Sequence, residues 1–275
     1  LALSLVGRKR AERHFLCVTS SSVLPSESFQ LCLPSVPGAA TVSSATSVSV
    51  DALDDSSIRA IAGAIAFGGK AGIGLSFAWN RLENQTWSWI GTSDVDTTGL
   101  VSVDATTDNS IDTVSAAIAA SKGQMAGAGA VTINTIDNST QSWIAGQRAG
   151  DGVDGDAGVT VNANDSSRIF GLAGAAGGAK GAGVGISFAW NDVDNTVDAG
   201  LKDNTDVAST AGSVAVTADS TTHIESIAVG GGVASKVGLS GSGSVTQAGN
   251  TVKAHVDAGS KVTADGNVKV AASDD

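Results

Sequence analysis

The sequence predicts an all-β fold, a parallel β-solenoid built from a tandem repeat of about 55 residues. The first observation is the repeat itself, which occupies residues 41–275. The second is an alternation of apolar with small or polar residues, which is the period of a half-buried strand. The third is composition: glycine supplies 35 of 275 residues and aromatics only 4%. Such a chain is expected to bring its backbones close together around small side chains.

Residues 1–40 are expected to form a non-repeat leader, poorly ordered or foreign to the repeat domain that follows at 41–275. Both cysteines and all three prolines fall in the leader. Its apolar stretch precedes the basic run at residues 8–10, the reverse of the order in a secretory signal, so we identify no export signal here.

Each repeat begins with an alternating apolar motif. It reads VSVDA twice, then VTVNA, VAVTA and VKVAA, and begins at Val48, Val101, Val159, Val214 and Val268. The repeats therefore span about 48–100, 101–158, 159–213 and 214–267, and a fifth begins at 268. At ~3.3 Å per residue, one coil of 55 residues would have a perimeter of roughly 180 Å, too wide for side chains to fill. We therefore expect about two rungs per repeat, each made of a strand, a short Asp/Asn-rich corner and a second strand.

The tetrapeptide FAWN occurs twice, and its aromatic residues are expected to lie in the core. Ile133 and Val245 replace its tryptophan in sister repeats, which favours an inward apolar position over a pair of ligand sites. The predicted core residues are Phe77, Trp79, Phe188 and Trp190.

An asparagine follows this position in every repeat, at Asn84, Asn138, Asn195 and Asn250. We interpret these asparagines as corner residues, because Asn tolerates left-handed backbone and hydrogen-bonds its own turn. Their side chains can also stack into ladders along the solenoid axis.

Trp87, Trp89 and Trp143 form the candidate ligand-binding patch. Trp89 and Trp143 adjoin the inward Ile90 and Ile144, so alternation turns both rings outward, and Trp87 shares the face of Trp89. Exposed aromatic patches commonly mark interaction sites, and flat rings suit sugars or a partner protein. The alternative is that a loop or a neighbouring strand covers them.

The charge of the chain argues against nucleic acid and anionic lipid headgroups as partners, because its formal net charge is -11. The glycine-rich segment 146–158 groups Asp151, Asp154 and Asp156, and Ca²⁺ is the one cofactor that the pattern suggests. This spacing suits calcium only loosely, since the segment lacks the calcium-binding nonapeptide and the EF-hand glutamate. An ordinary solvated loop is the favoured interpretation.

No catalytic residue is assigned, and the protein is expected not to be an enzyme. The histidines His14, His223 and His255 are isolated, and no nucleophile, base and orienting acid can be assembled around them. A β-helical carbohydrate-active enzyme is retained as an alternative, although repeats this regular offer no obvious cleft.

The Ala/Gly-rich stretches raise a second alternative, a membrane-active module that inserts them as hairpins. Residues 60–79 are long enough to span a bilayer. However, Lys70 stands in their middle, and an equivalent lysine recurs at Lys122, Lys180 and Lys236. A repeated lysine at this place indicates two strands joined by a bend.

The pattern VxVxAxxxSxI, an Ala/Gly-rich stretch and then GxxxSFAWNxxxNT resembles the repeats of very large bacterial surface proteins. These are the filamentous-haemagglutinin-like adhesins, including leukotoxin-family filamentous adhesins and related autotransporter passengers. The resemblance covers about residues 41–275. It implies a right-handed β-helix rod, a secreted or cell-surface location, and export by a two-partner or autotransporter route through an outer-membrane transporter.

The implied function is that of a stalk or passenger segment of an adhesin that attaches to host cells or other bacteria during virulence. Host-cell glycans or matrix proteins are the implied partners. Open sheet edges at the ends of the rod also predict end-to-end self-association.

Overall fold

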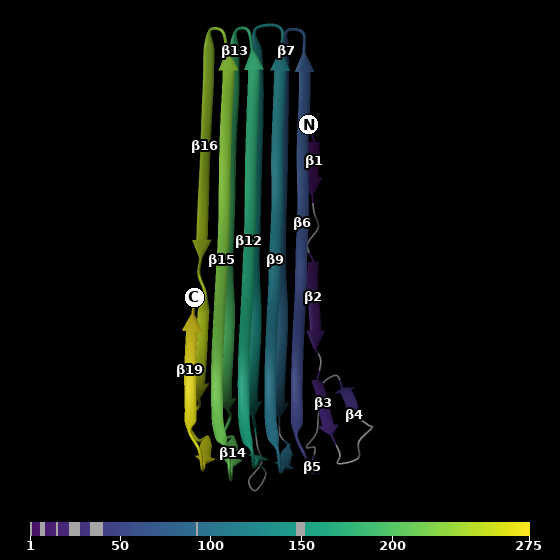
Figure 1. Ribbon diagram of the computed structural model, residues 1–275, viewed down its shortest axis with the longest axis vertical. Coiled ribbons are helices and arrows are strands. Elements are labelled where there is room, and N and C mark those ends of the chain that lie inside the picture. The colour runs from purple at the N-terminus through teal and green to yellow at the C-terminus, as the bar shows by residue number, and fades with distance from the viewer. Residues whose placement is uncertain are drawn as a thin grey trace.

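The computed structural model describes residues 2–5, 9–14, 16–21, 28–33, 41–91, 93–146 and 152–275. The regular elements in these ranges are strands, and most of them belong to three parallel sheets. Within the sheets, strands from successive repeats lie side by side (Figure 1). The predicted all-β parallel solenoid is therefore confirmed. Across the described ranges, no helix is long and apolar enough to cross a bilayer.

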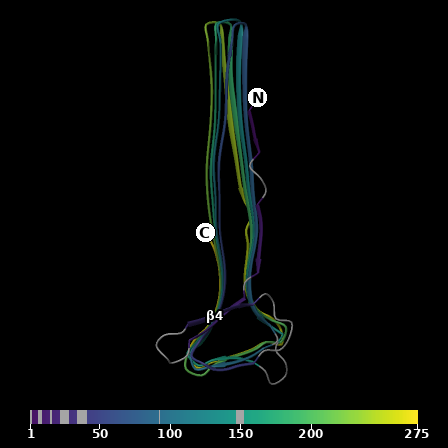
Figure 2. The same ribbon diagram turned by 90° about the vertical axis from the view of Figure 1, so that its right-hand side faces the viewer.

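Two of the three sheets are built from long strands. The first long sheet contains β6 (Val48–Gly68), β9 (Leu100–Ser121), β12 (Gly158–Ala179), β15 (Ser213–Ala234) and β19 (Val268–Asp274). The second contains β7 (Ala71–Gly91), β10 (Met125–Ala145), β13 (Ala182–Lys202) and β16 (Val237–Ala248), with β17 (Thr251–Val256) also paired to β13. These sheets face each other and form a thin blade (Figure 2).

A short sheet closes each coil at one end of the blade, which we call the base. It contains β5 (Thr41–Ala45), β8 (Asp94–Thr97), β11 (Val153–Gly155), β14 (Asp206–Ser209) and β18 (Lys261–Ala264). At the opposite end, the tip, β6, β9, β12 and β15 bend directly into β7, β10, β13 and β16 (Figure 1).

The described residues of the leader form four further strands. β1 (Ala2–Leu5) and β2 (Lys9–His14) pair with β7, and β3 (Leu16–Ser21) pairs with β4 (Ser28–Leu33). The origin of the leader and its separation from the repeat domain stay predictions.

Each repeat forms one rung, so the prediction of about two rungs per repeat is wrong. Val48 pairs with Val101, Val101 with Val159, and Val159 with Val214, so the register advances by one whole repeat from strand to strand. A perimeter of roughly 180 Å is too wide to fill only if the cross-section of the coil is round. In the structure the two long strands of a coil lie against each other, so 55 residues enclose only a thin interior (Figure 2).

The aromatic residues of FAWN point outward, so their predicted place in the core is wrong. Ala78 is 1% exposed, whereas Trp79 is 48% exposed. In the second copy, Ala189 is buried while Phe188 and Trp190 lie at the surface, and Phe77 is only half-buried. The reason is that β7 runs from Ala71 to Gly91 without a corner. Strand parity therefore places Trp79 on the same side as Trp87 and Trp89.

The recurring asparagines lie within or beside the long strands, so their predicted corner role is also wrong. Asn84, Asn138 and Asn195 are buried inside β7, β10 and β13, and Asn250 lies half-buried between β16 and β17. The residues with left-handed backbone at a corner are instead Asp203 and Asn204, between β13 and β14.

Three of the four asparagines form a ladder along the second long sheet, and hydrogen bonds from their row also cross to the first long sheet. The backbone N–H of Asn138 donates to Asn195 Oδ1, and that of Asn195 donates to Asn250 Oδ1. Across the interior, Asn84 Nδ2 donates to Asp54 Oδ1 at 2.8 Å, and Asn195 Nδ2 donates to Asp165 Oδ1 at 2.7 Å. The amide nitrogens of Asn84 and Asn195 are thus paired with buried carboxylates, as a dry interior requires, whereas Asn84 Oδ1 has no hydrogen-bond partner among the described residues.

Apolar clusters lie on both sides of this ladder. A Val, Ile and Leu cluster fills the base, and a second cluster around Leu82, Ile111, Ile136 and Ile169 lies on the tip side of the ladder. Nearer the tip the interior is lined by alanine. Small side chains there let the two sheets approach closely: a Cβ added at Gly185 would come within 2.1 Å of the Gly231 carbonyl oxygen.

The buried carboxyl of Asp165 makes the stability of the blade depend on pH. Burial raises its pKa to about 6, and hydrogen bonds from Ser167, Asn138 and Thr140 offset only part of that effect. Because the folded pKa lies above the unfolded value, the folded chain binds more protons between about pH 4 and 6. The contribution of protonated Asp165 to the free energy of unfolding is therefore complete below about pH 4. It is lost as pH rises through 6, which lowers the free energy of unfolding by up to about 3 kcal/mol.

Asp165→Asn is expected to remove this loss, because the amide is neutral at every pH. The measurement is the free energy of unfolding in urea from pH 4 to pH 8, followed by circular dichroism. Asp219→Asn, which changes an exposed carboxylate of the same sheet, serves as the control and should keep the wild-type slope. An unchanged slope in Asp165→Asn would contradict the assignment.

Candidate functional site

The predicted aromatic patch is present on the outer side of the second long sheet, toward the base. Trp89 of β7 pairs with Trp143 of β10, and Trp87 pairs with Gln141. Ile90 and Ile144 are buried, and the three tryptophans are half-buried on the opposite side of the strands. The outward orientation inferred from alternation is therefore confirmed.

The rings pack mainly against one another. Trp89 and Trp143 stack with centroids 5.3 Å apart and planes 6° apart, and Trp87 meets Trp143 edge-on at 6.3 Å. Trp89 approaches Trp143 from β7, on one side of β10. Lys202 approaches from β13, on the other side, and its Nζ lies 5.0 Å from the centre of the Trp143 ring. Both faces of Trp143 are thus covered, which leaves its edge for any ligand and makes the stack a link between three rungs.

The patch ends in charged groups on the following rungs. Lys202 Nζ forms an ion pair with Asp198 Oδ2 at 2.7 Å, and His255 Nδ1 lies 3.1 Å from Asp198 Oδ1. Gly200, which pairs with Trp143, is covered by the His255 ring, since an added Cβ would lie 2.7 Å from that ring. The aromatic surface is therefore confined to the first two complete rungs.

The carboxylates proposed for calcium lie on or beside the short sheet. Asp151 is outside the described residues. Asp154 lies in β11 beside Asp96 of β8, and Asp156 follows in the next turn. Burial raises the pKa of Asp154, and the carboxylates of Asp156, Asp96 and Asp206 raise it further. Where side chains are described, no group of three His, Cys, Asp or Glu residues could hold a metal ion, and calcium binding stays a prediction.

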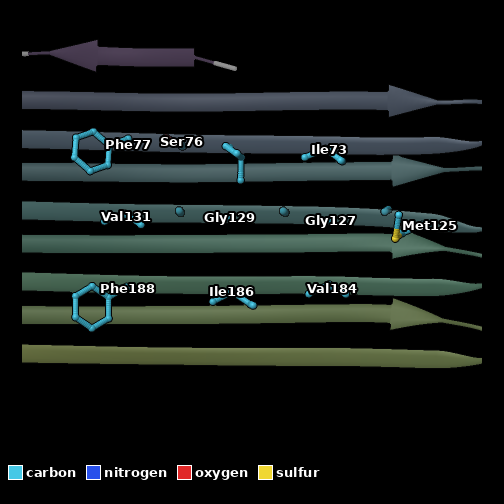
Figure 3. A pocket seen from close by; sticks show the side chains of 14 residues that line it. Ile73, Ser76, Phe77, Met125, Gly127, Gly129, Val131, Val184, Ile186 and Phe188 are labelled. Atoms are coloured by element: carbon cyan, nitrogen blue, oxygen red, sulfur yellow. The ribbon is translucent and has the colours of Figure 1, made fainter.

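An apolar groove on the outer side of the second long sheet was not predicted from the sequence. A groove of about 600 Å³ runs along β10 toward the tip. Gly127 and Gly129 form its floor, and the side chains of β7 and β13 rise on either side of it, including Ile73, Phe77 and Ile186 (Figure 3). The groove could have been predicted if the alternation of inward and outward residues had been continued without a corner from Ile90 back to Trp79. That alternation places Trp79, Phe77 and Ile73 on the outer side of the sheet.

Comparison with known proteins adds no relative. A scan against protein-family models, a search of curated proteins and a search of solved structures each return no match for this chain.

Proposed function

We propose that the chain is a structural, non-catalytic segment of a secreted bacterial adhesin at the cell surface. It acts as a rigid stalk that supports attachment to host cells or other bacteria by holding the binding surfaces of its parent protein away from the envelope. The observation that carries this proposal is the register. β7, β10 and β13 pair residue for residue over 21 positions each, so successive repeats stack as rungs in one continuous register.

The distribution of variation along the rungs supports the same function. Inward positions hold like residues from rung to rung, as with Ile58, Ile111 and Ile169. Outward positions drift, as with Trp143, Gly200 and His255. A stalk requires only that inward residues stack from rung to rung, so its outward residues can vary. An active site would instead require particular side chains on particular rungs.

The partners proposed for the parent protein are host-cell glycans or matrix proteins, with export through an outer-membrane transporter. Within this segment, Trp87, Trp89 and Trp143 contribute to rung stacking. Because both faces of Trp143 are covered, we assign that ring no sugar-stacking role, and ligand binding by Trp87 and Trp89 stays a prediction.

A display experiment tests the stalk function. A short binding peptide is placed after Asp275, the chain is anchored at its N-terminus on bacterial cells, and capture on ligand-coated plates is measured. We expect capture to exceed that of cells carrying the peptide without the chain. The chain alone should be retained by no glycan or matrix protein. Specific retention of the chain alone, lost in a folded variant with all three patch tryptophans changed to alanine, would instead make it an adhesive surface.

A further inference from the structure

The outer side of the second long sheet is entirely apolar from the tip to the level of Trp79. β7, β10, β13 and β16 each present five outward positions there, beginning with Ala71, Met125, Ala182 and Val237, and none of these positions is polar or charged. Large side chains stand in water: Ile73 is 63% exposed and Ile186 is 53% exposed. The next outward row consists of Arg81, Thr135, Asp192 and Gln247.

The first long sheet has the same arrangement on its own outer side. Outward positions from Ile61 to Phe67, and their partners in β9, β12 and β15, are again free of polar side chains. Ile61 and Phe67 are 82% and 80% exposed. The row below them consists of Arg59, Asp112, Phe170 and Glu225.

The two apolar surfaces end at one height. Asn80 Nδ2 of β7 donates to Thr113 Oγ1 of β9 at 2.6 Å, so these residues lie opposite each other across the blade. Trp79 and Val114 lie just on the tip side of this bond, and Arg81 and Asp112 just on the base side. A second copy of the chain would cover one face. A planar apolar medium would cover both faces to the same depth.

The dimensions and the boundary residues match a lipid bilayer. Nine residues from Ala71 to Trp79, at ~3.3 Å each, give a height of about 30 Å, close to the hydrocarbon thickness of a bilayer, ~30 Å. Trp79 and Trp190 lie in the last apolar row, and tryptophan concentrates where hydrocarbon meets the headgroups.

The tip carries positive charge although the whole chain is acidic. The exposed lysines Lys70, Lys122, Lys180 and Lys236 lie at its bends, and among the residues that the structure describes they are the only charged ones between the two boundary rows. The acidic excess that argues against anionic surfaces is therefore carried by the base half. Locally, the tip is complementary to anionic headgroups.

We propose that the tip half of the blade inserts into a lipid bilayer that contains anionic lipid, with the Trp79 row at the interface and the base in water. The strands enter as a preformed solenoid, which distinguishes this mode from insertion of separate hairpins. β9, β10, β12 and β13 are hydrogen-bonded on both sides, as hydrocarbon requires. In the tip half, β6 and β15 are the outermost strands of the first long sheet, β16 is an outermost strand of the second, and β1 pairs with β7 at Ser76–Trp79. Copies are expected to join edge to edge at the outermost strands in the membrane.

Vesicle flotation of the full 275-residue chain tests this proposal. Wild-type protein is expected to float with phosphatidylcholine vesicles containing about a third phosphatidylglycerol, and less with phosphatidylcholine alone. The double variant Ile73→Glu, Ile186→Glu should lose partitioning by at least about tenfold, because charge is excluded from hydrocarbon. Thr135→Glu with Thr196→Glu, on the same face below the boundary, is the matched control and should float like the wild type. Circular dichroism checks that both variants fold.

The depth at which the tryptophans lie in the bilayer is a second measurement that tests the proposal. Lipids brominated along the acyl chains should quench wild-type tryptophan fluorescence, and Trp79→Phe with Trp190→Phe should remove most of that quenching. Failure of the wild type to float would overturn the proposal. If sedimentation then shows a dimer that Ile73→Glu, Ile186→Glu converts to monomer, the apolar face belongs to a second copy of the chain. Equal flotation with both lipid compositions would overturn the role of the lysines.

Discussion

Replacing Asn138 by alanine is expected to lower the free energy of unfolding by about 4 kcal/mol. Asn138 Nδ2 donates to Asp165 Oδ2 and Ser167 Oγ, and its Oδ1 accepts from Asn109 Nδ2. Alanine would leave these buried groups short of partners in an interior that water does not reach, and each unsatisfied group costs about 1–3 kcal/mol. Urea unfolding followed by circular dichroism measures the loss.

Asn164→Ala provides the matched control for this change. Asn164 points outward in β12, on the side of the strand opposite Asp165, so its removal should cost less than about 1 kcal/mol. Equal losses in the two variants would show that the interior ladder contributes no more than any surface asparagine.

Ile136→Ala is expected to destabilise the blade by about 3 kcal/mol, through lost burial and the cavity left behind. Ile136 is fully buried between the long sheets and packs in one cluster with Leu82, Ile111 and Ile169. The thin interior has backbone on both sides, so neighbouring side chains cannot easily collapse into the gap.

The control for the cavity is Ile118→Ala, because Ile118 is 49% exposed on the outer side of β9. We expect this variant to lose less than about 1 kcal/mol in the same urea experiment. A loss for Ile118→Ala as large as that for Ile136→Ala would mean that the outer apolar side chains are buried in solution.

The repeat predicted the fold because strands that stack in register require similar residues at equivalent positions of every repeat. Val48, Val101, Val159 and Val214 recur at the spacing that later appears as strand register. The number of rungs per repeat was not predictable in the same way. Asn84 and Asn138 look like corner residues when their surroundings are unknown, and only the opposite sheet, with Asp54 and Asn109, provides a partner for them inside a strand.

That one error also misplaced the aromatic residues. An assumed corner near Asn84 let both Trp79 and Ile90 be placed inward, although they lie an odd number of residues apart in one strand. The outward orientation of Trp87, Trp89 and Trp143 was predictable because no corner was assumed between these tryptophans and the inward Ile90 and Ile144. Alternation within one strand was therefore enough to orient them. Their mutual stacking was not, since it depends on the register between β7 and β10.

The exact correspondence of one repeat to one rung has a consequence for inheritance. Recombination between equivalent positions, such as Val101 and Val159, removes or adds a complete rung and leaves every remaining strand in register. An insertion of one residue inside β10 would instead turn all later side chains of that strand to the opposite face. Genes built on this plan can therefore change the length of the protein in whole-rung increments without passing through misfolded intermediates.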